Sequence, residues 1–129
     1  MAKSIKLKNN NYIDSTGITH ERELLSNILT MKKYSANNYL VNGWSTNGLN
    51  VLANINGLKI ISLCVRFGTS TRIMENLPND MRPAGAILVM ANNYLNTSYA
   101  IISAEGNIDI NSSLLVSTNT AIILTAIYY

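Results

Sequence analysis

The amino-acid sequence predicts a mainly β protein: a compact antiparallel β-barrel or sandwich over residues 34–129, preceded by an extended arm and one short helix over residues 1–33. From residue 34 onward, apolar and polar residues alternate and turn-forming residues recur roughly every eight to twelve positions, which is typical of antiparallel β proteins. Of the 129 residues, 47% are hydrophobic, enough for the core of one domain. Only 13% are charged, so asparagine, serine and threonine, 41 residues together, must supply most of the polar surface.

The first segment, residues 1–17, has the pattern of an extended arm. Ile5 and Leu7 alternate with lysines, and a run of asparagines then interrupts the alternation. Tyr12 and Ile13 follow as a second short apolar pair. We therefore expect this segment to make local contacts rather than a core of its own.

A short helix is predicted next, beginning at Thr19 as N-cap and ending near Lys33. Acidic residues occupy its first turn and lysines its last turn, where each charge suits the helix dipole. Four apolar residues fall on one helical face: Leu24, Leu25, Ile28 and Leu29. A helix of about 14 residues is marginal alone in water, so this face needs a partner, either the rest of the chain or copies of itself.

The β strands are predicted from alternation and from turn residues. Asn56-Gly57 is a strong type I′ hairpin signal, and Gly106-Asn107 indicates a second tight turn. Residues 77–83 contain Pro78 and Pro83, so this segment cannot form a central strand and is predicted to be a loop. We expect Arg82 to bind carbonyl groups of that loop. The predicted strands are residues 49–55, 58–67, 71–74, 86–91, 99–104, 108–110 and 120–128.

The last of these strands is apolar almost throughout, so both of its faces should be covered. A single small barrel has only one interior. We therefore expect one face of the strand to pack in the core and the other, with Ile123 and Ile127, to contact a neighbouring subunit.

Charge is distributed unevenly along the chain. Residues 1–33 carry six lysines and arginines against three carboxylates, whereas residues 34–129 carry four of each sign. A nucleic-acid surface needs several clustered cations, and the neutral β region cannot supply them. We expect no nucleic-acid partner.

No apolar run approaches the roughly 20 residues that a membrane span requires. After Lys3 the chain alternates instead of entering an apolar stretch, so the sequence indicates no signal peptide. We expect synthesis in a cytoplasm and no membrane insertion.

Groups for catalysis are scarce. The chain has one histidine, His20, at the predicted helix start, and one cysteine, Cys64, within an apolar strand. No spacing of histidine and cysteine fits a metal, and no glycine-rich loop fits a phosphate. Glu105 and Asp109 flank a turn without a general-acid partner. We expect no enzyme activity, no metal and no cofactor.

Sugar binding, in contrast, uses the residue types that this chain has in plenty. A saccharide is held by an aromatic face against its C–H groups and by neutral amides and hydroxyls on its hydroxyl groups. Two polar–aromatic clusters supply candidate residues: Asn42 and Trp44, and Asn92, Asn93, Tyr94 and Tyr99. The alternative is that Trp44 belongs to the core and the tyrosines are ordinary strand residues.

A series of short motifs follows in a characteristic order: Asn47-Gly48-Leu49, the Asn56-Gly57 turn, Leu77-Pro78 with Met81-Arg82-Pro83, Glu105-Gly106-Asn107-Ile108-Asp109-Ile110 and the terminal Ile127-Tyr128-Tyr129. This order resembles C-terminal head domains of phage tail fibres. More narrowly, it resembles receptor-binding proteins on the baseplates of phages that infect Gram-positive bacteria. The resemblance covers roughly residues 40–129, and residues 1–33 look like N-terminal attachment segments of phage tail proteins.

The resemblance implies a homotrimer located in the virion, with β-barrel heads that adsorb to host cell-wall saccharides. It also implies that residues 1–33 attach the protein to other tail or baseplate proteins, and it supplies the partner that Leu24, Leu25, Ile28 and Leu29 require. The chain lacks the long shoulder or neck of larger members. The alternative is a non-catalytic structural virion component, a collar, plug or fibre, that binds only other virion proteins.

Overall fold

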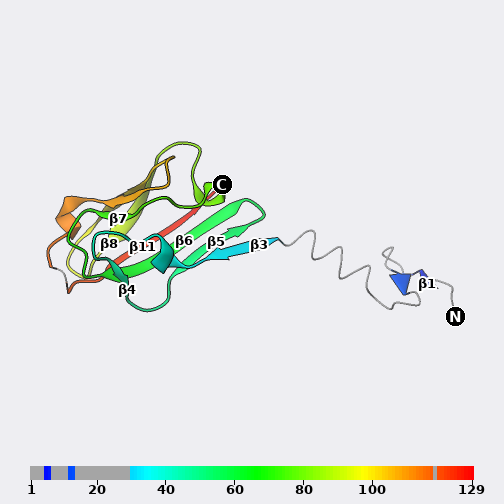
Figure 1. Ribbon diagram of the computed structural model, residues 1–129, viewed down its shortest axis with the longest axis horizontal. Helices are drawn as coiled ribbons and strands as arrows, with labels where there is room; N and C mark the ends of the chain where they lie inside the picture. The colour runs from blue at the N-terminus through cyan, green and yellow to red at the C-terminus, as the bar shows by residue number, and fades with distance from the viewer. Residues whose placement is uncertain (1–4, 7–11, 14–29, 118) are drawn as a thin grey trace. The chain divides into compact units, whose positions relative to one another are not determined.

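The computed structural model describes the backbone of residues 5–6 and 12–13 and the whole of residues 30–117 and 119–129 (Figure 1). The chain divides into two units, residues 1–31 and 32–129. In the first unit, β1 (Ile5–Lys6) pairs antiparallel with β2 (Tyr12–Ile13). Most of the predicted helix lies outside the described residues. The four apolar residues of its predicted contact face lie there too: Leu24, Leu25, Ile28 and Leu29.

The predicted end of that helix is wrong. Lys32 and Lys33, assigned to its last turn, lie in strand β3 (Met31–Tyr34), which pairs with β5 (Val51–Ile55) at one edge of the large sheet. Pairing with a neighbouring strand overrides the helical preference of lysine. Exposed lysines also suit an edge strand, because their charge discourages pairing with other chains.

The second unit is built on one antiparallel sheet of nine strands, so the mainly β prediction is confirmed. The strand order is β3-β5-β6-β11-β8-β9-β10-β7, and β4 pairs with β6 beside this path. The remaining strands are β4 (Ser45–Thr46), β6 (Leu58–Arg66), β7 (Arg72–Met74), β8 (Ile87–Asn92), β9 (Thr97–Ile102), β10 (Ile108–Ile110) and β11 (Ile122–Tyr128).

The sheet is open and curled, and the segment that follows β3 reaches the opposite edge strand β7. Leu40, just after the short 3-10 helix η1 (Ala36–Asn38), forms a bridge with Met74 of the opposite edge strand β7. Val41 N donates to Ile73 O at 3.0 Å close to that bridge. The curl gives the sheet an enclosed inner face and an exposed outer face (Figure 1).

The core fills the inner face, as the period-two pattern requires. Along β11, Ile122, Leu124 and Ala126 are buried, whereas Ile123 and Ile127 on the other face are exposed. The largest fully buried side chains are Leu52, Ile61, Leu63, Ile73, Met74, Leu77, Met81, Ile102, Ile108, Leu114, Ile122 and Leu124.

Turn chemistry determines the hairpins. Asn56 and Gly57 both have positive φ, 52° and 90°, as a type I′ turn requires, so this predicted hairpin is confirmed. The second predicted turn lies slightly earlier than expected: Gly106 N donates to Ser103 O at 3.0 Å, and Gly106 has φ 85°.

The loop bracketed by prolines contains the 3-10 helix η2 (Asn79–Met81) and is fastened at several points. Arg82 Nε donates to Leu77 O at 2.6 Å, which confirms that this arginine binds a loop carbonyl. The hydroxyl of Tyr34 donates to both carboxylate oxygens of Asp80, at 2.6 and 2.7 Å. The hydroxyl of Tyr128 donates to Met81 O at 2.5 Å.

Candidate functional site

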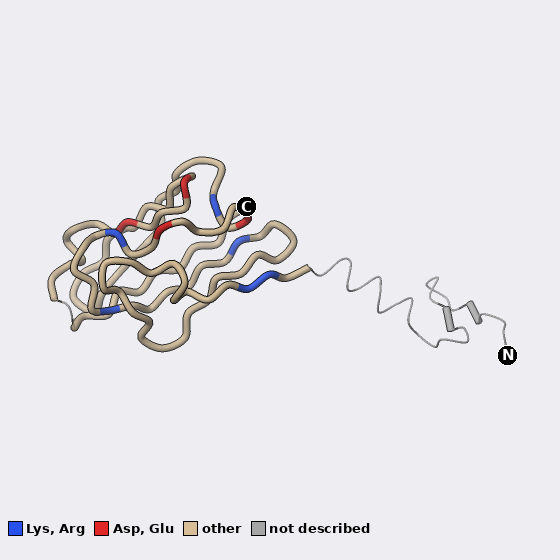
Figure 2. Tube along the Cα trace, viewed as in Figure 1, with Lys and Arg blue, Asp and Glu red and all other residues tan. Residues whose placement is uncertain are grey.

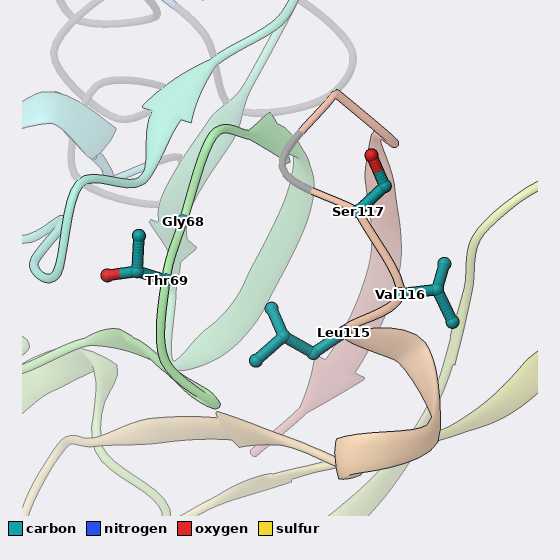
Figure 3. A pocket seen from close by; sticks show the side chains of 5 residues that line it. All are labelled: Gly68, Thr69, Leu115, Val116 and Ser117. Atoms are coloured by element: carbon teal, nitrogen blue, oxygen red, sulfur yellow. The ribbon is translucent and has the colours of Figure 1, made fainter.

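A pocket of about 280 Å³ lies where two loops meet at one end of the curled sheet. Gly68 and Thr69, which follow β6, form one wall, and Leu115, Val116 and Ser117, which precede β11, form the other (Figure 3). The lining is mainly apolar and includes Leu115 and Val116, with the hydroxyl-bearing Ser117 beside them. The side chain of Thr69 points away from the second wall (Figure 3), and no lining residue is titratable. Such a surface suits a neutral ligand with an apolar face.

The first wall rests on the residues of the first predicted cluster. The backbone nitrogen and the hydroxyl of Thr69 both donate to Asn42 O, at 3.1 and 3.2 Å. The indole nitrogen of Trp44 donates to Ser70 O at 2.9 Å. A Cβ at Gly68 would lie 1.8 Å from the indole ring, so the chain packs directly against Trp44.

Trp44 is therefore a core residue, and its proposed stacking on a sugar is corrected. Its exposed fraction is 6%, because one ring face is covered by the backbone of Gly68 and the indole N–H is already used. The side chain of Asn42 donates to Arg72 O at 3.1 Å, so this amide also has a structural bond. Asn42 and Trp44 therefore support the first wall of the pocket without lining it.

The second wall rests on a residue of the second predicted cluster. Asn93 is 6% exposed, and its amide nitrogen donates to Leu114 O at 3.0 Å. Its side-chain oxygen accepts from the backbone nitrogens of Leu95 and Asn96, at 2.9 and 2.6 Å. This amide has donors and acceptors satisfied within the protein, so it positions the β8–β9 tip against η3 (Ser112–Leu114) instead of facing solvent.

The first predicted cluster and Asn93 of the second thus lie behind opposite walls of one pocket, although the lining residues themselves were not predicted. A sequence signal for them exists: hydroxyl-bearing residues are dense in residues 69–71 and 112–117. That signal was weak because such residues are abundant along the whole chain.

The other predicted residues are accessible. Tyr94, at the β8–β9 tip, is 83% exposed. Tyr99 is partly exposed on the outer face of β9, opposite Met90 of β8, and Asn92 is half-buried opposite Ile123 of β11. The structure does not bring Tyr94 and Trp44 together around one ligand, because Trp44 is buried.

A second feature is an apolar surface on the outer side of the sheet. Leu88 lies opposite Ile101, and Met90 lies opposite Tyr99. Leu88, Met90 and Ile127 are each more than 60% exposed, and Ile123 is 49% exposed. We call this surface the outer apolar face; it comprises Leu88, Met90, Tyr99, Ile101, Ile123 and Ile127.

Charged side chains are sparse and dispersed over the described part of the chain (Figure 2). Arg72 forms a bidentate pair with Asp109, at 3.0 and 3.2 Å, and this hydrogen bonding raises the pKa of Arg72. Within residues 30–117 and 119–129, no three histidine, cysteine or carboxylate side chains cluster as metal ligands would. No helix of those residues has the length and apolarity needed to cross a membrane.

Comparison with known proteins found no matching family model, no matching curated protein and no matching solved structure.

Proposed function

We propose that this chain is a non-catalytic adsorption protein of a phage tail or baseplate, which binds host cell-wall saccharides through its β unit. The observation that carries the proposal is the pocket between Gly68–Thr69 and Leu115–Ser117. Apolar side chains of Leu115 and Val116, which suit the C–H faces of a sugar, adjoin the hydroxyl-bearing Ser117 there, and no lining residue is titratable.

The surroundings of the pocket support the same ligand class. Tyr94, which is 83% exposed at the neighbouring β8–β9 tip, is an aromatic of the kind that stacks on pyranose rings. The tip is joined to η3, which directly precedes the second wall, by hydrogen bonds from Asn93 to Leu114 and from Asn96 to Ser113. A sugar chain longer than one residue could therefore contact both the pocket and Tyr94.

In this proposal the protein works as a homotrimer in the virion, and residues 1–33 attach it to other tail or baseplate proteins. The outer apolar face supports self-association, because contiguous exposed apolar surface on a small protein usually marks an interface. It includes Ile123 and Ile127, which the sequence pattern assigned to subunit contacts.

Glycan binding tests the proposal directly. The full chain is applied to an array of cell-wall saccharides from Gram-positive bacteria. Two variants are tested in parallel: the double variant Thr69→Val with Ser117→Ala, and the single variant Tyr94→Ala. We expect the wild type to bind a subset of glycans. The double variant should lose at least tenfold in affinity, since each of its two lost hydrogen bonds is worth about 1 kcal/mol and 1.4 kcal/mol is tenfold. Tyr94→Ala should lose about fivefold, since an aromatic contact is worth about 1 kcal/mol.

A matched control is Ser35→Ala, which removes an exposed hydroxyl that makes no capping bond at η1. The control should bind as the wild type does. Binding that is unchanged in both the double variant and Tyr94→Ala would reject this site, and the absence of any bound glycan would reject saccharide recognition.

The outer apolar face also favours a second candidate, a structural virion component that binds only other virion proteins. If this second candidate is correct, the protein binds no glycan on the array, whereas it still self-associates or captures a tail protein through Leu88, Met90 and Ile127.

A further inference from the structure

Five neighbouring strands of the large sheet, β5, β6, β11, β8 and β9, turn an almost uncharged face outward. Every second residue of each strand lies on this side; Ser62 of β6, for example, lies opposite Val51 of β5 and Thr125 of β11. Apart from Arg66 at the end of β6, no outward position on these five strands carries a charged residue. The outer apolar face therefore continues past β11 onto β6 and β5.

The continuation on β5 and β6 has a low relief. We call it the β5–β6 surface; its residues are Val51, Ala53, Ile60, Ser62 and Cys64. All of them except Ala53 are half-buried. Ala53 is 3% exposed and yet does not belong to the core cluster, so larger side chains beside it, such as Ile60 opposite it on β6, cover it from the outer side.

The outer apolar face, in contrast, has large side chains that project from the sheet. Leu88 and Met90 are each 68% exposed, and Tyr99 and Ile101 are each 38% exposed. Projecting side chains pack best against small or recessed ones, because the two layers then interdigitate without voids. The outer apolar face and the β5–β6 surface therefore complement each other in shape.

Together the two surfaces have the size of an interface. Strands lie about 4.8 Å apart and outward residues about 6.8 Å apart, so five strands with three outward residues each cover about 24 by 20 Å, or about 480 Å². Soluble monomers rarely expose an apolar patch larger than this, and the largest patches are often interaction sites. The partner must itself be uncharged, because a charge buried against this face would remain unpaired. A second copy of the chain meets both requirements.

We propose that the outer apolar face of one copy packs on the β5–β6 surface of a second copy, and that the second copy packs in the same way on a third. A contact between two different surfaces cannot be completed in a pair, because each copy keeps one surface free. It is completed in a ring, where every copy uses both surfaces. This inference rests on the homotrimer of the proposed function and specifies which surfaces of its β units meet.

Mixing two variants tests the pairing of the surfaces. Met90→Glu disrupts the outer apolar face and Ser62→Glu disrupts the β5–β6 surface, and the mass of the full chain is measured by light scattering on a sizing column. We expect three times 14.2 kDa for the wild type and 14.2 kDa for each variant alone. An equimolar mixture should give a species of two chains, because one intact surface of each variant remains and no third copy can join.

Controls separate the contact from a general effect of the substitutions. Met90→Leu and Ser62→Ala retain an uncharged side chain and should keep the wild-type mass. Asn79→Glu adds the same charge on η2, at an exposed position, and should also keep it. A second pair, Leu88→Glu with Ile60→Glu, repeats the mixing test at other positions of the same two surfaces. A two-chain species shows in addition that both mixed variants are folded.

The outcomes distinguish this inference from the proposed function. Mixtures of both pairs that stay at the mass of one chain, or a Ser62→Glu protein that keeps the mass of three, would overturn the pairing and leave a homotrimer formed through other contacts. A two-chain wild type would overturn it in favour of a symmetric contact. A one-chain wild type would overturn the homotrimer as well. Glycan binding is tested independently, because none of the substituted residues lines the pocket.

Discussion

The backbone nitrogen of Leu77 donates a 3.0 Å hydrogen bond to the carbonyl oxygen of Gly106, which joins the proline-bracketed loop to the β9–β10 turn. The carbonyl of Leu77 in turn accepts from Arg82 Nε. Two motifs that are almost 30 positions apart in the sequence, the Leu-Pro…Arg-Pro loop and the Gly-x-Ile-x-Ile hairpin, are thus one structural unit. Packing and hydrogen bonding at this junction therefore restrict which residues both motifs can carry.

Gly106→Ala should destabilise the fold. A Cβ at Gly106 would lie 2.8 Å from Arg82 Nε and 2.9 Å from Leu77 N, and φ is 85°, so the substitution adds both a clash and backbone strain. Together these cost about 2 to 4 kcal/mol in the free energy of unfolding, which urea denaturation would measure.

Gly85→Ala is the matched control, because a Cβ there meets nothing within 4 Å and its φ is not in the left-handed region. It should be neutral or stabilise by up to about 1 kcal/mol. Equal effects of the two substitutions would contradict the close approach at Gly106.

The sequence predicts the hairpins and alternating strands well because those signals are local. Asn56-Gly57 specifies its turn through two positive φ values, and β10 (Ile108–Ile110) was predicted with its observed bounds. Lys32 and Lys33 were assigned wrongly because pairing of β3 with β5 is a long-range contact that helix propensity does not register.

The candidate site was harder to predict for the same reason. Trp44 stands between turn-forming residues, and only the approach of Gly68 from a later loop reveals that its ring is covered. The pocket combines residues 68–69 with residues 115–117, whose proximity arises from the curl of the sheet. Alternation did predict that Ile123 and Ile127 face away from the core.

Trp44→Ala should unfold or strongly destabilise the protein. Removing a buried indole leaves a cavity and an unpaired Ser70 carbonyl, at a cost of about 3 to 5 kcal/mol. Tyr94→Ala, at an 83% exposed position, should change the free energy of unfolding by less than about 0.5 kcal/mol. Thermal unfolding of both variants separates the two roles, and a fully stable Trp44→Ala protein would disprove the core assignment.

Alkaline pH should weaken the fold through two tyrosines. The hydrogen bond to Asp80 raises the pKa of Tyr34 to about 12, and burial raises the pKa of Tyr128 to about 12. Each pKa is higher in the folded than in the unfolded chain, where it is 10.0, so the contribution to stability is complete below pH 10 and is lost as pH rises toward 12.

Thermal unfolding between pH 9 and pH 12 would measure this effect. In Tyr34→Phe the melting temperature should fall less steeply above pH 10 than in the wild type, and Tyr128→Phe should behave similarly. Curves for all three proteins that run parallel over this range would show that neither phenol titrates as described.

The outer apolar face should control the oligomeric state. We expect the full chain to have a solution mass of three times 14.2 kDa by light scattering on a sizing column. Ile127→Glu, which places a charge on a side chain that is 64% exposed, should shift the mass toward one chain without lowering the stability of the monomer.

Asn79→Glu is the control for this experiment, since it adds the same charge at an exposed position of η2, away from the outer apolar face. Its mass should equal that of the wild type. Because a charge buried at an interface costs several kcal/mol whereas one in water costs little, only a true contact makes the two variants differ. A wild-type protein that is monomeric over the whole accessible concentration range would reject self-association through this face and leave the pocket as the sole basis for function.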